Sequence, residues 1–211
     1  MTGIITCEES QEVTKAFRSK GHAFYSNDIL DCTGGHEEWH WIKPISESLL
    51  KTQIFPGKTW DFIGAHPPCT YTTNSGVRWL YNKDGSKNLE RWKKLEESMN
   101  FFNMIKRNIK TGYLENPIPH KYARDGFYSV VTGQWVEGIG KYTQLIQPWQ
   151  FGHGETKATC LWLINLPELK PTDIVEGREQ KIWKMPPSKE RQKLRSKTYH
   201  GIAKAMAQQW G

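Results

Sequence analysis

Residues 3–28 read GIITCEESQEVTKAFRSKGHAFYSND, and this stretch decides the class of fold. Two runs in it have the apolar and β-branched composition of strands: residues 3–7 and residues 22–28. Between them, residues 10–20 carry three apolar side chains at helical spacing: Val13, Ala16 and Phe17. Gly21 then suits the C-terminal cap of that helix. A strand, a helix and a strand within so short a stretch predict a βαβ unit and therefore a parallel sheet.

The rest of the chain continues this alternation. Three further runs are typical of strands: residues 60–65, 111–117 and 160–166. Residues 89–109 predict a long amphipathic helix, and residues 198–210 predict a closing one. This order favours an α/β, Rossmann-like fold with a mostly parallel sheet flanked by helices, in which ligands gather at the carboxyl ends of strands. We expect a single domain over residues 1–211, with residues 167–194, rich in Pro, Lys and Glu, as a surface connection.

Composition narrows the class of protein. The 211 residues include 29 Lys and Arg against 22 Asp and Glu, a formal net charge of +7, which suits a polyanionic partner. The 4 cysteines form no CxxC pair, so we expect reduced thiols and neither a disulfide framework nor a zinc ribbon. No run approaches the roughly 18 apolar residues of a membrane span. We therefore expect a soluble, cytoplasmic monomer.

Two polar residues follow or end predicted strands and are candidates for chemistry. Cys69 comes after the strand at 60–65, and Pro67 and Pro68 before it stiffen the loop and remove two amide donors. A thiol held in this way is a candidate nucleophile, although a free cysteine is often only a small buried residue. Glu115 ends the strand at 111–117, where an isolated carboxylate is common. Together, across neighbouring strand ends, the two form a plausible dyad.

These residues lie in motifs that resemble those of the DNA cytosine-5 methyltransferases. PPCTYTTNSGVR at 67–78 is similar to the PPCQxFSxxGxR loop of that superfamily, and LENP at 114–117 looks like its ENV or ENP motif. RSKTYHGIAKAM at 195–206 is similar to its C-terminal motif. TKATCLWL at 156–163 stands where its base-contacting arginine motif lies. The motifs keep the family's order over most of the chain, and the short phage-encoded members are the most similar.

The resemblance implies a reaction and a set of residues. In this family a cysteine thiolate adds to carbon 6 of a flipped cytosine, a glutamate holds N3, and carbon 5 is methylated from S-adenosylmethionine. It thus implies Cys69 as nucleophile, Glu115 as acid and DNA as partner, with Asn116 holding the carboxylate or the loop, or serving only as a turn residue. The implied cofactor contacts are Cys7, Glu8, Ser10, Asp28, Ile29, Pro67 and Ser196. The implied substrate contacts are Pro68, Thr70, Ser75, Arg78 and Lys157.

The sequence departs from the family on the cofactor side. The family's FxGxG turn is replaced by TCEESQ at 6–11, which has no glycine. Asp28 matches the acid that grips the ribose, but Lys43-Pro44-Ile45 stands where an aspartate contacts the adenine. An altered cosubstrate therefore stays open. The sequence shows no separate target-recognition domain. Residues 118–150 mix cations with aromatic side chains and are a candidate for contacting DNA, with a solvated loop over buried tryptophans as the alternative.

Several alternatives remain open. Residues 36–40, HEEWH, match the HExxH zinc motif, but Gly34, Gly35 and Pro44 leave barely two helical turns, and no third ligand is evident downstream. The loop HPPCTY also resembles the loop of amino-methyltransferases, which would place an aromatic residue at position 69. RNA cytosine is a further possible substrate. A catalytically silent DNA-binding homologue is the remaining class.

Overall fold

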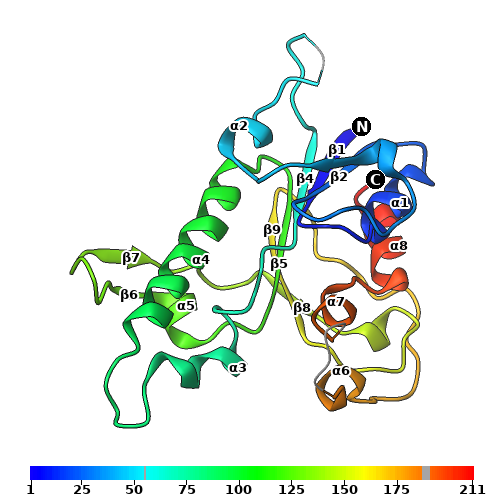
Figure 1. The fold of residues 1–211 in the computed structure, drawn as a ribbon. Coiled ribbons are helices and arrows are strands. Elements are labelled where there is room, and N and C mark those ends of the chain that lie inside the picture. The colour runs from blue at the N-terminus through cyan, green and yellow to red at the C-terminus, as the bar shows by residue number, and fades with distance from the viewer. Residues whose placement is uncertain (55, 187–190) are drawn as a thin grey trace.

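The computed structural model describes residues 1–54, 56–186 and 191–211. Within them, seven strands form one sheet of order β3-β2-β1-β4-β5-β9-β8 (Figure 1). These strands are β1 (Thr2–Thr6), β2 (Ala23–Asp28), β3 (His40–Ile42), β4 (Phe62–Ala65), β5 (Gly112–Pro117), β8 (Gln144–Ile146) and β9 (Thr159–Ile164). Strands β1 to β5 run parallel, while β9 runs antiparallel to both β5 and β8. The predicted α/β, Rossmann-like fold is confirmed.

Helices cover both faces of the sheet (Figure 1). On one face, α1 (Glu12–Arg18) packs against α8 (His200–Gln209), and their apolar side chains join a core with Phe24, Phe62 and Tyr113. On the other face, α2 (Glu47–Leu50) and α4 (Leu89–Asn108) share a core with the opposite side of the sheet. β1 is buried along its whole length, as expected for a strand covered on both faces.

The βαβ unit forms where the sequence predicts it. Val13 and Phe17 of α1 are fully buried, because their helical spacing directs both toward the sheet. Gly21 closes the turn that follows α1: its amide donates to the Arg18 carbonyl, and its φ of 84° is a left-handed conformation that glycine adopts without the steric cost of a Cβ. The helix is shorter than the predicted span of 10–20, since Gln11 before it also has a positive φ, 56°, and α1 begins only at Glu12.

The region between β5 and β9 contains structure that the sequence pattern did not predict. β8 completes the edge of the main sheet, so this part of the expected DNA-contacting segment 118–150 belongs to the fold itself. The remainder consists of α5 (Lys121–Asp125), β6 (Gly126–Tyr128), β7 (Trp135–Glu137) and the 3-10 turn η3 (Pro148–Gln150). β6 and β7 pair as a hairpin that projects from the body (Figure 1). Strands of three residues are too short to show an alternating pattern.

The expected surface connection 167–194 is mostly irregular in the part that the structure describes. It is pinned by two isolated bridges, Phe151 with Asp173 and Glu155 with Glu179, and contains α6 (Lys181–Lys184). Residues 187–190 of this connection lie outside the described residues. α7 (Arg191–Ser196) follows and leads into α8. None of the described helices is long and apolar enough to cross a membrane.

Candidate active site

A cavity of about 290 Å³ lies at the carboxyl ends of the central strands. β1 and β4 are neighbours, yet the chain continues from β1 toward β2 and β3 on one side and from β4 toward β5 on the other. Such a reversal of strand order leaves a crevice above the strand ends, because the connections leave in opposite directions. Cys7 directly after β1 and His66 directly after β4 both line this cavity.

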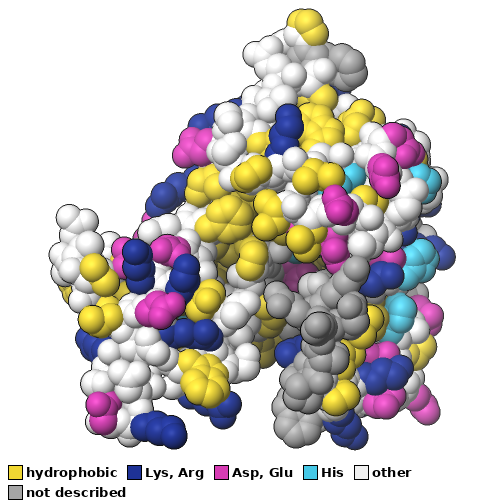
Figure 2. Space-filling model, viewed as in Figure 1, with side chains coloured by type: hydrophobic (Ala, Val, Ile, Leu, Met, Phe, Trp, Pro, Cys, Tyr) yellow, Lys and Arg dark blue, Asp and Glu magenta, His cyan; other side chains and the backbone are white. Residues whose placement is uncertain are grey.

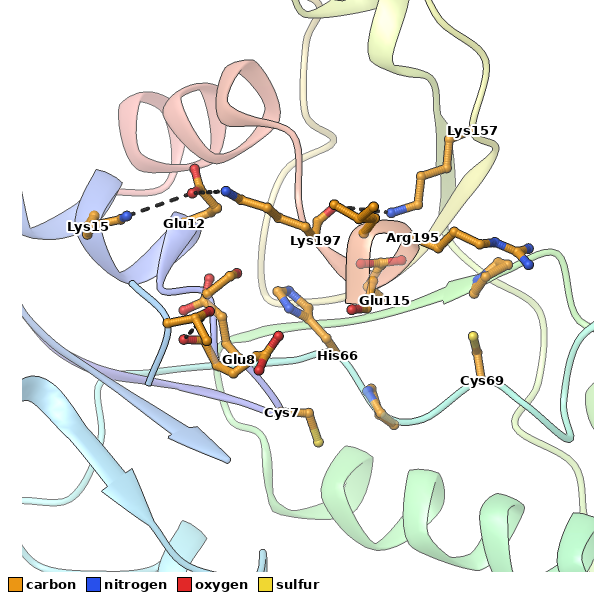
Figure 3. Close-up of a pocket in the computed structure, with 17 residues that line it drawn as sticks. Cys7, Glu8, Glu12, Lys15, His66, Cys69, Glu115, Lys157, Arg195 and Lys197 are labelled. Atoms are coloured by element: carbon orange, nitrogen blue, oxygen red, sulfur yellow. Dashed lines mark hydrogen bonds and ion pairs between the residues drawn. The ribbon is translucent and has the colours of Figure 1, made fainter. Parts of the chain in front are cut away.

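The two chemical candidates from the sequence line this same cavity. Cys69 follows β4 by four residues and Glu115 lies in the last half of β5, so the parallel pairing of β4 and β5 brings both to one edge. Lys157 joins them because it precedes β9, and the first residues of an antiparallel strand lie at the edge where its parallel neighbours end. Arg195, from α7, completes this end of the cavity (Figure 3).

The surroundings of Cys69 oppose its ionisation overall. Burial raises the pKa of the Cys69 thiol, and the Glu115 carboxylate raises it further by repelling a thiolate. Lys157 and Arg195 act in the other direction and lower the pKa. The thiol is therefore protonated at neutral pH until substrate binding or a base changes this balance.

Asn116 positions the loop that carries Cys69. Its side chain is only 1% exposed, and its Oδ1 accepts a hydrogen bond from the Thr72 hydroxyl at 3.0 Å. The backbone amide of Thr72 in turn donates to the Cys69 carbonyl at 3.2 Å. Asn116 Nδ2 donates to the Pro117 carbonyl at 2.6 Å, which orients the amide. Asn116 does not line the cavity, so of the roles open to it the structure favours holding the loop.

His66 is a functional candidate that the sequence reasoning missed. Its ring lines the cavity between the Cys69 end and the Cys7 end (Figure 3), and its Nε2 is 2.7 Å from the Tyr113 hydroxyl. Burial lowers the pKa of His66, with Glu115 raising and Lys157 further lowering it, so the imidazole is neutral at physiological pH. The only available signal was its position, directly after a strand that leads to the candidate nucleophile.

The opposite end of the cavity is rich in charge of both signs. Glu8, Glu9 and Ser10 line it together with Cys7, as do Pro67 and Thr33. Glu12 pairs with Lys197 at 3.1 Å and with Lys15 at 3.7 Å, and all three side chains line the cavity (Figure 3). Ser196 lines it as well. This end therefore offers both carboxylates and ammonium groups to a ligand.

The turn after β1 reaches its shape without a glycine. Cys7 has a φ of 57°, in the left-handed region where a side chain costs roughly 1 kcal/mol or more. Burial raises the pKa of the Cys7 thiol, and the Asp28 carboxylate raises it further, so this second thiol stays protonated. The segment 6–11 thus forms this turn without a glycine, at the cost of local strain.

Glu8 caps α1 from this turn. Its carboxylate is 3% exposed and accepts hydrogen bonds from the Val13 amide at 2.6 Å and from the Thr14 hydroxyl at 2.6 Å. Burial raises the pKa of Glu8 to about 7, against the lowering effect of these hydrogen bonds. The amides at the start of α1 are therefore satisfied by a side chain of the protein itself, and Glu8 acts on the site by shaping it.

This burial predicts a measurable pH dependence of stability. A carboxyl whose pKa is about 7 when folded and 4.5 ordinarily binds its proton more tightly in the folded state. Its contribution to stability is complete below pH 4.5 and is lost as the pH rises through 7. Between pH 5 and 8, wild type should lose about 2–3 kcal/mol of unfolding free energy relative to Glu8→Gln.

Urea unfolding of both proteins at several pH values measures this difference. Glu9→Gln is the matched control, since Glu9 is the next residue along the chain and its side chain is only half-buried. It should follow wild type at every pH. If the unfolding free energies of wild type and Glu8→Gln change in parallel with pH, the buried, proton-binding state of Glu8 is wrong.

Some of the implied contact residues lie outside the cavity. On the cofactor side these are Asp28 and Ile29, and on the substrate side they are Pro68, Thr70, Ser75 and Arg78. Asp28 Oδ1 accepts hydrogen bonds from the Ile29 and Leu30 amides, at 2.7 and 3.1 Å, and so shapes the loop after β2. All four substrate-side residues are exposed; Pro68 directly precedes Cys69, and the other three follow it. The cavity therefore brings together Cys69, Glu115, Lys157, Cys7, Glu8, Ser10, Pro67 and Ser196.

The HExxH segment does not form the geometry of a zinc site. Glu37–Trp39 is a single 3-10 turn, and His40 already belongs to β3, so His36 and His40 do not lie one turn apart on a helix. His40 is instead held by the Ser26 hydroxyl and the Leu30 carbonyl. Among the described residues, no group of three or more His, Cys, Asp or Glu side chains is arranged to hold a metal ion.

Comparison with models of known protein families finds no match, and comparison with curated proteins finds none either. The fold and the cavity are therefore the observations from which a function is argued.

Proposed function

We propose that this protein is a DNA cytosine-5 methyltransferase that acts through a covalent Cys69 adduct. One observation carries the proposal: Cys69 and Glu115 line a single cavity at the carboxyl ends of adjacent parallel strands. A nucleophile and an acid that line one cavity are what addition to an electron-poor pyrimidine ring requires. The ordered motifs around both residues support the same reaction.

In this proposal, Cys69 supplies the electron pair that activates the ring, and Glu115 exchanges a proton with N3. The Cys69 thiolate forms a bond to carbon 6, while the Glu115 carboxyl hydrogen-bonds N3 and stabilises the protonated ring, so that carbon 5 becomes nucleophilic. S-adenosylmethionine, when bound, supplies the methyl group that carbon 5 takes up. A water molecule in the cavity then takes the carbon 5 proton, and the electrons of that C–H bond restore the double bond between carbons 5 and 6 and expel the Cys69 sulfur as thiolate. N3 returns its proton to the Glu115 carboxylate. Because carbon 6 is inaccessible in stacked DNA, the target base must leave the helix.

The basic groups around Cys69 have a role in this scheme. A protonated thiol cannot add to the ring, and the neutral imidazole of His66 is a base within the same cavity. Lys157 and Arg195 lower the pKa of Cys69 and so stabilise the thiolate that forms. Arg195 is exposed, and none of the described residues forms an ion pair with it, which leaves it available for a substrate phosphate.

The Cys7 end of the cavity fits the amino-acid part of S-adenosylmethionine. That part carries one ammonium and one carboxylate, and Glu12, Lys15 and Lys197 present groups of opposite charge to each. The Glu8 carboxylate already accepts hydrogen bonds from groups at the start of α1. The lysines, rather than the amides of that helix, would therefore hold the cofactor carboxylate. Ser10, Pro67 and Ser196 would line the same part.

Mass spectrometry of nucleosides tests the proposal directly. DNA of mixed sequence is incubated with the protein and S-adenosylmethionine bearing a deuterated methyl group, then digested to nucleosides. We expect deuterated 5-methyldeoxycytidine, and the same digest of treated RNA separates the RNA alternative. Label on an exocyclic nitrogen would indicate an amino-methyltransferase, and unlabelled nucleosides from both polymers would reject the proposed activity.

A catalytically silent DNA-binding protein is the second candidate. The observation that favours it concerns Asp28, which lies outside the cavity. Its Oδ1 accepts hydrogen bonds from two amides of the loop after β2 and is therefore not free to bind a ribose through those bonds. Calorimetric titration with S-adenosylmethionine separates the two candidates. Saturable heat favours the enzyme, whereas DNA binding without any cofactor heat and without methylation favours the silent protein.

A further inference from the structure

The surface that follows Cys69 in the chain concentrates positive charge. Residues 70–94 contain 6 basic and 2 acidic side chains, so this short stretch has a net charge of +4 out of the +7 of the whole chain. It comprises the loop after Cys69, α3 (Asn74–Val77), the 3-10 turn η2 (Arg78–Leu80) and the start of α4. Figure 2 shows Lys and Arg side chains beside hydrophobic ones on the lobe where Figure 1 places α3. Charge of this sign is complementary to a phosphate backbone.

Aromatic rings are interleaved with these cations. The Arg78 guanidinium lies 4.5 Å from the centre of the Trp79 ring, and the Arg91 guanidinium lies 4.4 Å from that of Tyr71. Trp79 is 53% exposed although it is one of the largest apolar side chains. An exposed tryptophan with a planar cation on its ring offers a flat surface for stacking, while its neighbours attract phosphate.

This aromatic surface is fixed relative to Cys69. Gly76 of α3 packs so tightly on the turn after Cys69 that a Cβ at position 76 would lie 2.8 Å from the Thr70 carbonyl oxygen. Arg91 Nη2 donates to that same carbonyl at 3.5 Å. Leu80, the residue after Trp79, is 2% exposed and anchors η2 in the core. Trp79 therefore lies on a well-packed element that is joined directly to the nucleophile loop.

We propose that Trp79, with Arg78 on its ring, is a stacking platform for a nucleobase of the strand that delivers its target base to Cys69. This inference rests on the proposed function, which supplies the nucleic-acid substrate. It adds the contact that holds the substrate strand. Stacking tolerates any base, because every base has a π face, so this contact contributes affinity without sequence preference. Arg78 and its basic neighbours contact the phosphates on either side.

Fluorescence anisotropy of a labelled single-stranded oligodeoxynucleotide, and of its duplex, tests the platform without cofactor. Trp79→Ala should weaken binding of the single strand roughly tenfold to a hundredfold, because one stacked base is lost, and Trp79→Phe should restore part of it. Arg78→Gln should reduce the slope of the logarithm of affinity against the logarithm of salt concentration by about one, because one phosphate contact is lost. Trp39→Ala is the matched control, since Trp39 also carries an arginine on its ring, with the Arg18 guanidinium 3.9 Å from the ring centre, but stands in the 3-10 turn Glu37–Trp39, outside residues 70–94. It should bind as wild type does.

The outcomes separate this inference from the proposed function. Equal affinity of Trp79→Ala and wild type, in a protein whose nucleoside digests show methylation, would overturn the platform alone. Equal weakening in Trp79→Ala and Trp39→Ala would overturn it too, because any tryptophan with an arginine on its ring would then suffice. A wild-type protein that neither binds nor methylates nucleic acid would overturn the proposed function and the platform with it.

Discussion

Cys69→Ser should form no covalent complex with DNA that carries 5-fluorocytosine, and its methyl transfer should fall below detection. Fluorine on carbon 5 cannot leave as a proton, so an enzyme that has attacked carbon 6 stays attached. A serine hydroxyl is a far weaker nucleophile than a thiolate at neutral pH, and no base in the cavity is strong enough to deprotonate it fully. Denaturing gel electrophoresis after incubation with the cofactor measures the complex.

Two other cysteine variants make this experiment specific. Cys32→Ser is the matched control, because Cys32 is half-buried, does not line the cavity and donates only to the Gln11 side chain. It should form the complex as wild type does. Cys7 is the other thiol that lines the cavity. A complex that persists in Cys69→Ser and disappears in Cys7→Ser would show that the nucleophile has been assigned to the wrong strand end.

Glu115→Gln should slow methyl transfer by about a hundredfold or more while DNA binding stays near the wild-type level. Glutamine keeps the shape of the side chain and can still hydrogen-bond a base, but it carries no carboxyl to stabilise a protonated ring. Single-turnover rates with saturating DNA, together with binding by anisotropy, separate the two effects. Glu97→Gln, on the exposed side of α4 and paired with Lys94 there, is a control that should leave the rate unchanged.

Although Glu115→Gln should slow methyl transfer, it should make the Cys69 thiol more reactive toward an alkylating reagent. Because the Glu115 carboxylate raises the pKa of Cys69, its removal should lower that pKa and increase the thiolate fraction. Alkylation of Cys69 by iodoacetamide, followed by peptide mass spectrometry, should therefore be faster in Glu115→Gln than in wild type. Slower alkylation together with a normal methylation rate would mean that the two side chains do not share a site.

Much of the fold could be predicted from local patterns. The predicted strand at 3–7 forms as Thr2–Thr6, the helix at 89–109 forms as Leu89–Asn108, and the strand at 111–117 forms as Gly112–Pro117. These elements bury long apolar runs or a continuous helical face, so their periodicity is strong. β3 and β8 have three residues each and could not be found in this way. Their positions depend on pairing with β2 and β9, which are distant in the chain.

Part of the candidate site could likewise be predicted from the sequence, and part of it could not. Cys69 and Glu115 could be paired in advance because each stands at the end of a predicted strand, and parallel strands end at one edge of a sheet. Arg195 and Lys197 could not be placed there, since Arg195 lies in α7 and Lys197 in the short link from α7 to α8. His66 was adjacent to the motif in sequence, but its burial and its bond to Tyr113 depend on how β4 and β5 pair.

By itself, the sequence of this protein determined the α/β class, the order of its main elements and the two strand ends that carry a thiol and a carboxyl. Those properties follow from local periodicity and from residues that adjoin strands. Only the tertiary structure decided that one cavity joins Cys69 and Glu115 to His66, to Lys157 and to the charged cluster of Glu12, Lys15 and Lys197. The burial of a side chain and the electrostatic effect of neighbouring charges on it both depend on groups that are distant in the chain. Folding alone brings those groups together.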